Sequence, residues 1–160
     1  MIETSRARLR HFIPSDYDFL RSLDTDPDIM KFTPAKVVQT PEQTRARLER
    51  YSQNPGVWAA LDKQTDDFIG WFMLISTDLE FPEIGFMLVK KFWGQGLASE
   101  IANAIIEKAF DQEGHAGICA RTTLDNFASM QVLKKLGFAL SSQNTEVNFF
   151  VLKNPTASQS

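Results

Sequence analysis

The chain has 160 residues, a formal net charge of −3, 43% hydrophobic residues and 23% charged residues. This length predicts one domain with one core, and the composition is typical of a soluble globular protein. The weak acidic excess argues against a nucleic-acid-binding protein, because binding to the phosphate backbone needs a clustered excess of Lys and Arg. Because Cys119 is the single cysteine and no stretch resembles a signal peptide or a membrane span, we expect a cytoplasmic protein with no internal disulfide and no nucleic-acid or membrane partner.

The N-terminal part of the chain predicts a strand followed by a short helix. Residues 6–12 alternate arginine with Ala, Leu and His, and this period of two indicates a half-buried strand with a charged outer face. Ser15 stands at the N-cap position of the following helix. We expect that helix to end before Pro27, because the residue before a proline disfavours the helical conformation.

The middle of the chain predicts a capped helix and then three strands. Thr40 precedes a proline, and Gln43 stands three positions later, which is the pattern of a capping box at a helix start. Residues 57–61 and 68–76 have the pattern of strands joined by a polar turn, so they predict a hairpin. A third strand of this group follows Glu83 and leads into a pair of glycines.

The C-terminal part predicts two helices and three strands. Apolar residues at helical spacing follow Leu97. A second helix begins at Asn126 and ends at Gly137, a residue that favours a left-handed cap. Strand patterns occupy residues 118–124, 138–141 and 147–153. The order of elements predicts a mixed α/β domain with one central sheet over residues 1–153, and a flexible polar tail over residues 154–160.

Two glycines stand at the turn between a predicted strand and a predicted helix. Without a Cβ, Gly94 and Gly96 allow positive φ and a close approach of the backbone to a ligand. The start of the following helix offers unpaired N–H groups and the positive end of its dipole, which suit a pyrophosphate. A plain tight turn is the alternative. A dinucleotide loop fits poorly because Ser99 replaces its third glycine, and no Gly-Lys-Ser or Gly-Lys-Thr completes a nucleoside-triphosphate loop.

Several motifs occur in a recognisable order. They are Phe-Trp-Gly-Gln-Gly-Leu-Ala-Ser-Glu after Lys91, Glu-Ile-Gly-Phe at residues 83–86, Asn-Phe-Ala-Ser at residues 126–129 and Lys-Leu-Gly-Phe at residues 135–138. Together they resemble the Gcn5-related N-acetyltransferases, the GNAT superfamily, and most closely its ribosomal-protein N-acetyltransferase branch, the RimJ and RimL type. The glycine motif resembles the family's acetyl-CoA pyrophosphate loop, with Lys91 where the family usually has Gln or Arg.

The resemblance implies a fold and an activity. The fold is the GNAT-type acyl-CoA N-acyltransferase fold, a mixed α/β architecture with about four helices and a mostly antiparallel sheet of about six to seven strands that contains a splayed parallel pair. The activity is transfer of the acetyl group of acetyl-CoA to a primary amine by direct attack in a ternary complex. The acceptor is a protein N-terminal α-amino group or a small-molecule amine. The resemblance implies acetyl-CoA as co-substrate, no metal, and a monomer or homodimer.

The resemblance also implies which residues bind the cofactor. The backbone of residues 87–89 pairs with the pantetheine arm, and the N–H of Met87 or Leu88 is the expected oxyanion donor. Asn126 bonds the pantetheine or its sulfur end. The full set of implied cofactor-binding residues is Met87, Leu88, Val89, Lys91, Phe92, Trp93, Gly94, Gln95, Gly96, Leu97, Ala98, Asn126 and Ser129.

Two residues are candidates for proton transfer. Glu83 at the entrance of its strand is the candidate base, acting through water, although a solvated strand end is the alternative and Asp78 or Glu80 offers the same chemistry. Ser129 is the candidate proton donor to the leaving sulfur, because the family's helical tyrosine has no counterpart here. Helix capping is the alternative role of both Asn126 and Ser129.

The positions of the histidines and of the cysteine in the sequence do not predict a metal site or a nucleophile. His11 and His115 have no further ligand nearby in the sequence, so we expect no metal centre. Cys119 lies in a predicted buried strand, where a cysteine packs as a small apolar residue. A catalytically silent acyl-CoA-binding or regulatory domain is the alternative function, since it keeps the glycine loop without the acid and the base.

Overall fold

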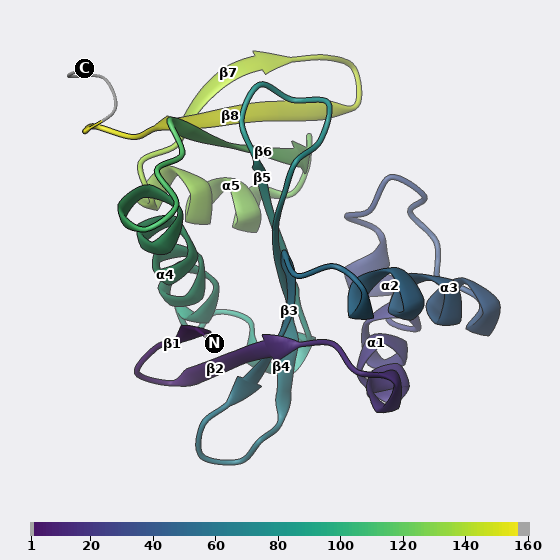
Figure 1. The fold of residues 1–160 in the computed structure, drawn as a ribbon. Coiled ribbons are helices and arrows are strands. Elements are labelled where there is room, and N and C mark those ends of the chain that lie inside the picture. Colours follow the sequence, from purple (N-terminus) through teal and green to yellow (C-terminus); the bar gives the residue numbers. More distant parts are fainter. Residues whose placement is uncertain (1, 157–160) are drawn as a thin grey trace. The chain divides into compact units, whose positions relative to one another are not determined.

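The computed structural model describes residues 2–156, and its strands follow the order β1-β2-β3-β4-β5-β6-β8-β7. Its contacts divide the chain into two units. Unit 1 comprises Met1–Met73 and Phe86–Leu97, and unit 2 comprises Leu74–Gly85 and Ala98–Ser160. Strands β4 (Phe68–Ile75) and β5 (Glu83–Leu88), labelled in Figure 1, each run from one unit into the other.

Unit 1 joins a set of antiparallel strands to three helices, α1, α2 and α3, that lie beside one another (Figure 1). Strand β2 pairs with β3 with Leu9 opposite Ala60, and the expected alternation is confirmed because Ala7 and Leu9 are fully buried. Its elements besides β4 and β5 are β1 (Ile2–Glu3), β2 (Ala7–His11), η1 (Pro14–Asp16), α1 (Tyr17–Asp24), α2 (Pro27–Met30), α3 (Pro41–Ser52), β3 (Val57–Asp62) and η2 (Lys90–Phe92).

Local signals explain most helix boundaries in unit 1. The predicted capping box is confirmed: the Gln43 N–H donates to Thr40 Oγ1 at 3.2 Å, and the Thr40 N–H donates to Gln43 Oε1 at 2.8 Å. The expectation of Ser15 as N-cap was wrong, because a 3-10 turn precedes α1 and places Asp16 there. Pro27 ends α1 as expected but also begins α2, since proline fits the first helical position.

Unit 2 places helices beside a strand pair and a C-terminal hairpin. Strands β5 and β6 pair in parallel with Glu83 opposite Cys119, and β6 and β8 pair antiparallel with Cys119 opposite Val151. Helix α5 lies against β6 (Figure 1), and Gly137 after it has φ 98°, as its predicted cap role requires. The further elements are α4 (Leu97–Asp111), which begins on the last residue of unit 1, β6 (Gly117–Thr123), α5 (Phe127–Lys135), β7 (Ala139–Gln143) and β8 (Val147–Lys153).

The expected fold class is confirmed as a mixed α/β fold with a mostly antiparallel sheet and one parallel pair, β5 and β6. The described residues form eight strands and five α-helices, more than expected, because β1 and α2 are too short to leave a sequence pattern. Asn154, the first residue of the predicted tail, is held by the fold. Asn154 is buried, and its backbone N–H donates to the Ala116 carbonyl at 2.9 Å, whereas residues 157–160 lie outside the described residues.

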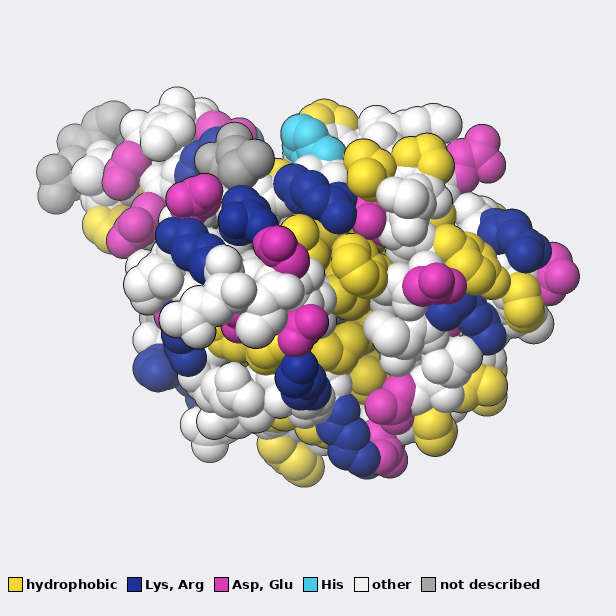
Figure 2. Space-filling model, turned by 90° about the horizontal axis from the view of Figure 1, so that it is seen from below, with side chains coloured by type: hydrophobic (Ala, Val, Ile, Leu, Met, Phe, Trp, Pro, Cys, Tyr) yellow, Lys and Arg dark blue, Asp and Glu magenta, His cyan; other side chains and the backbone are white. Residues whose placement is uncertain are grey.

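The surface carries mixed charge. On the face shown in Figure 2, Lys and Arg side chains lie next to Asp and Glu side chains instead of gathering in a single basic patch. Within the described part of the chain, none of the helices combines the length and the hydrophobicity needed to cross a membrane.

Gly70 generates a prediction about the packing of β4 against β5 in unit 1. A β-carbon at Gly70 would lie 2.0 Å from the Met87 carbonyl oxygen, a backbone atom that cannot rotate away. We expect Gly70→Ala to lower the free energy of unfolding by about 3 kcal/mol or more in urea denaturation. Gly114→Ala is the matched control, because Gly114 has φ 69° and open space around it, and we expect a loss of about 1–2 kcal/mol from backbone strain alone. Equal losses in the two variants would contradict the close approach.

Candidate functional site

The predicted glycine turn lies in unit 1 between the end of β5 and the start of α4. Gly94 has φ 73° and Gly96 has φ 77°, so both adopt the left-handed conformation. A β-carbon at Gly94 would meet nothing within 4 Å, and therefore the backbone conformation, not space, requires glycine there. Helix α4 begins directly afterwards at Leu97, with Ala98 in its first turn. This is the strand, turn and helix start that an anion site needs.

Arg6 lies beside this turn, although its sequence pattern did not predict a role. Its Nη1 donates to the Gln95 carbonyl at 2.9 Å, and its Nη2 lies 3.7 Å from the position of a β-carbon on Gly96. A fixed guanidinium therefore adds positive charge next to the helix start. Only its place on the charged face of a strand was visible in the sequence, because the two partners are 89 positions apart.

The two lysines before the turn are held by carboxylates of unit 1. Lys91 Nζ lies 2.7 Å from Asp67 Oδ2 and 5.3 Å from the centre of the Phe92 ring. Lys90 pairs with Asp28. The pairing lowers the pKa of Asp28 and of Asp67 because each carboxylate accepts a hydrogen bond from its lysine. The charge of Lys91 is therefore shared with Asp67.

The backbone of residues 87–89 is less open than expected. The Val89 N–H donates to the Ile69 carbonyl at 2.9 Å, and the Val89 carbonyl accepts from the Phe92 N–H at 3.0 Å. The Leu88 carbonyl accepts from Trp93 Nε1 at 3.0 Å. The Val89 N–H is therefore not available to a pantetheine arm, whereas the Val89 carbonyl oxygen keeps a second lone pair, so its pairing with the arm stays a prediction.

Glu83 lies in unit 2 and is buried, with 6% of its surface exposed, so the alternative of a solvated strand end was wrong. Arg121 Nε donates to Glu83 Oε2 at 3.0 Å, and Arg121 Nη2 donates to Oε1 at 2.7 Å. Asp78 Oδ1 lies 3.3 Å from the same nitrogen. The hydrogen bond with Glu83 raises the pKa of Arg121, so this guanidinium is permanently charged.

Asn126 and Ser129 lie together at the start of α5 in unit 2. The Ser129 N–H donates to Asn126 Oδ1 at 3.2 Å, so the capping role is confirmed. The capping bond uses the amide oxygen of Asn126 and not its NH2 group. Thr123, just before them, has a buried hydroxyl oxygen without a hydrogen-bond partner among residues 2–156.

The remaining candidates of the sequence fall outside any cluster. Cys119 is buried and free, and it lies on β6 opposite Glu83. Over residues 2–156, no group of three or more His, Cys, Asp or Glu side chains is arranged to hold a metal ion. The predicted residues thus lie at three places: the glycine turn in unit 1, and Glu83 and the Asn126–Ser129 pair in unit 2. Arg121, the partner of Glu83, was not predicted.

The lysine pairs generate a prediction about pH. A carboxylate whose folded-state pKa is lowered stabilises the fold above its unfolded-state pKa, and this contribution is lost as the pH falls through the lower, folded-state value. Carboxyl NMR titration should therefore give pKa values for Asp28 and Asp67 below the ordinary aspartate value. Lys90→Ala should raise the pKa of Asp28 alone and Lys91→Ala that of Asp67 alone. Ordinary values in the wild-type chain would contradict the two pairs.

Comparisons with known proteins agree with this geometry. The model of the family described as acetyltransferase (GNAT) domain matches residues 6–139. The chain is 31% identical over 147 residues to the uncharacterized protein YkkB of Bacillus subtilis, covering 86% of this chain and 84% of that protein.

Solved structures share the fold. An acetyltransferase of the GNAT family from Bacillus anthracis aligns with a TM-score of 0.87 at 21% identity over 96% of this chain and 98% of its own. Spermidine N-acetyltransferase from Vibrio cholerae, solved with CoA and spermine, aligns with a TM-score of 0.79 at 15% identity over 96% and 99% of the two chains. The chain therefore belongs to the GNAT family of acetyltransferases and is an acetyl-CoA-dependent N-acetyltransferase.

Proposed function

We propose that the chain transfers the acetyl group of acetyl-CoA to a primary amine by direct attack in a ternary complex. The observation that carries the proposal is the glycine turn at the start of α4, where Gly94 and Gly96 have positive φ and Arg6 supplies a guanidinium. Backbone N–H groups at a helix start, together with a nearby cation, suit a pyrophosphate. The spermidine enzyme of Vibrio cholerae has the same fold and, by its name, acetylates an amine.

The phosphate end of the cofactor is assigned to the glycine turn and to Leu97 and Ala98, the first residues of α4. The N–H groups of residues 94–98 bind the pyrophosphate, and Arg6 adds a charge-assisted hydrogen bond. Trp93 and Gln95 support the turn, since the Trp93 indole is bonded to Leu88 and the Gln95 amide donates to the Lys91 carbonyl at 3.0 Å. Phe92 and Leu97 are buried and anchor its two ends.

The reactive end of the cofactor is assigned to backbone and amide groups. The Leu88 N–H or the Met87 N–H stabilises the negative charge that develops on the carbonyl oxygen. The NH2 group of Asn126, which capping leaves unused, donates to the pantetheine arm. The Val89 N–H is left out of this set because it already donates to the Ile69 carbonyl, whereas the Val89 carbonyl oxygen can accept a second hydrogen bond from the pantetheine arm.

Two side chains of unit 2 are assigned to proton transfer. The amine nitrogen forms the new C–N bond as the C–S bond breaks, the amine proton leaves through water toward Glu83, and Ser129 donates a proton to the departing sulfur. Arg121 orients Glu83 by donating a hydrogen bond to each of its carboxylate oxygens.

The acceptor is assigned as a protein N-terminal α-amino group, as in the ribosomal-protein branch, or a small-molecule amine. Acidic side chains occur in the segment that leads into β5, at Asp78, Glu80 and Glu83. They favour an acceptor that arrives as a cation and loses its proton before attack.

Variants of the turn test the cofactor assignment. We expect Gly94→Ala to weaken acetyl-CoA binding about tenfold, because the strained turn no longer presents its N–H groups together. Gly114→Ala carries the same backbone strain away from the turn and should bind normally. Arg6→Ala should also weaken binding about tenfold, with partial recovery in Arg6→Lys, whereas Arg8→Ala, two positions further along in β2, is the control. Calorimetry measures all five, and normal binding by Gly94→Ala and Arg6→Ala would contradict the assignment.

Variants of unit 2 separate the enzyme from the silent domain. In a thiol-release assay with acetyl-CoA and a panel of amines, Glu83→Gln and Ser129→Ala should each lower kcat by about 10²-fold without changing acetyl-CoA binding. Ser141→Ala is the control for Ser129→Ala. Binding of acetyl-CoA without thiol release from any amine in the wild-type chain would establish the silent alternative.

A further inference from the structure

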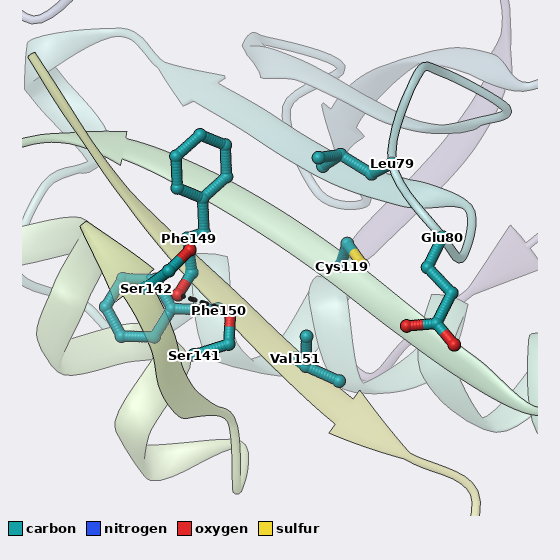
Figure 3. Close-up of a pocket in the computed structure, with 8 residues that line it drawn as sticks. All are labelled: Leu79, Glu80, Cys119, Ser141, Ser142, Phe149, Phe150 and Val151. Carbon is teal, nitrogen blue, oxygen red and sulfur yellow. Dashed lines mark hydrogen bonds between the residues drawn. The ribbon is translucent and has the colours of Figure 1, made fainter. Parts of the chain in front are cut away.

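Unit 2 contains a cavity of about 260 Å³ on one face of its sheet (Figure 3). Figure 3 shows the Phe149 ring and the side chains of Leu79 and Cys119 turned toward a common space, with the Glu80 carboxylate at its edge. Among the residues that line the cavity are Leu79, Glu80, Cys119, Ser141, Phe149 and Val151.

The floor of this cavity follows from strand register. Cys119 on β6 lies opposite Val151 on β8, and Arg121 lies opposite Phe149. Residues opposite each other, and residues two apart on one strand, share a face of the sheet. Glu83 lies opposite Cys119 on β5, so the proposed base is on the same face as the cavity floor.

The segment between β4 and β5 forms the wall of the cavity that carries Leu79 and Glu80. Two contacts hold it. Phe81 packs so closely on Gly117 that a β-carbon there would lie 2.7 Å from the ring, and Asp78 pairs with Arg121. The wall is therefore fixed to the strand that supplies the floor.

The charge near the cavity is negative. Three carboxylates, those of Asp78, Glu80 and Glu83, lie near one guanidinium, that of Arg121. Arg121 engages Asp78 and Glu83, whereas Glu80 forms no ion pair among residues 2–156. A cation bound at Glu80 would be attracted by a carboxylate that no side chain among residues 2–156 already neutralises.

The polar atoms near the cavity accept hydrogen bonds. The Ser141 hydroxyl donates its proton to the Phe149 carbonyl at 3.1 Å, so its oxygen offers lone pairs. An ammonium group has three donors and no acceptor, which matches this set. A flat aromatic ring such as that of Phe149 also attracts a cation.

We propose that this cavity binds the acceptor, and that the acceptor is a primary amine joined to an apolar group about the size of a phenyl ring. The apolar group lies among Leu79, Phe149 and Val151, and the ammonium group lies at Glu80. The cavity is open to solvent, and its volume of about 260 Å³ is larger than the roughly 150 Å³ of an enclosed apolar cavity that holds benzene, so it has room for a ring with a short linker. The inference rests on the proposed function, because it names the class of amine that receives the acetyl group.

Binding of model compounds tests the inference. We expect 2-phenylethylamine to bind the full chain in calorimetry, and 2-phenylethanol, which has the same ring without the charge, to bind at least about threefold more weakly. Glu80→Gln should remove this difference, and Val151→Phe should abolish binding of both by filling the cavity. Glu146→Gln, an exposed carboxylate in the same unit, is the control and should bind as the wild type does. Equal affinity for amine and alcohol, or unchanged binding by Val151→Phe, would overturn the inference.

The single cysteine gives a second measurement that does not depend on the fold of a variant. Cys119 lines the cavity, so its reaction with a thiol reagent in the wild-type chain should slow at least about threefold when 2-phenylethylamine saturates the protein. Cys119→Ser, which has no thiol, gives the background signal of the thiol reagent. No protection at a concentration that saturates the calorimetric signal would place the amine elsewhere.

Separate binding measurements with acetyl-CoA and with the amine distinguish a failure of this inference from a failure of the proposed function. Acetyl-CoA binding without amine binding would overturn the inference alone, and amine binding without acetyl-CoA binding would overturn the proposed function alone. A tripeptide with N-terminal phenylalanine presents the same pair of groups as 2-phenylethylamine. In the thiol-release assay, Glu80→Gln should raise KM at least about threefold, with kcat unchanged, for whichever of the two is acetylated.

Discussion

Strand β5 belongs to both units of the chain, and the main features of each unit follow from where it lies. At its beginning, Glu83 lies beside Cys119 in the parallel pair with β6. Toward its end, it packs on β4 so closely that only glycine fits at Gly70. The strand then ends, and the chain must turn immediately into α4. The positive φ values of Gly94 and Gly96 make that turn, and the turn presents the helix start to a ligand.

The charges of unit 2 follow from the burial of Glu83. A buried carboxylate is costly without a partner, and Arg121 supplies one through two hydrogen bonds. The same pairing engages both carboxylate oxygens of Glu83. The chemistry proposed here therefore relies on an amine that reaches the thioester in its neutral form, with Glu83 receiving the proton through water. Glu80, which has no ion-pair partner among the described residues, is then the group that first attracts the charged acceptor.

Short-range features of this fold were predictable from the sequence. The capping box of Thr40 and Gln43, the cap at Gly137 and the glycine turn each depend on residues a few positions apart, so their patterns are visible in the chain. The resemblance to the GNAT family added the parallel strand pair, which the family match over residues 6–139 supports.

Long-range contacts were not predictable in the same way. Arg6 contacts Gln95 across 89 positions, and Arg121 contacts Glu83 across 38, and neither pairing leaves a local pattern. Asn154 was expected in a loose tail, but its hydrogen bonds to the chain before β6 hold it in place. The cavity above β6 and β8 likewise arises from register and from one loop, so only the acidity of that loop was visible in the sequence.

The glycine turn is proposed to bind the phosphates of acetyl-CoA. Backbone amide NMR during a titration with acetyl-CoA measures this directly, because each N–H group of residues 94–98 reports its own hydrogen bond. We expect these amides to shift most and to shift downfield as charge-assisted hydrogen bonds form, and we expect NAD at the same concentration to leave them unchanged. Saturation by acetyl-CoA with these amides unmoved, or an equal response to NAD, would contradict the proposal.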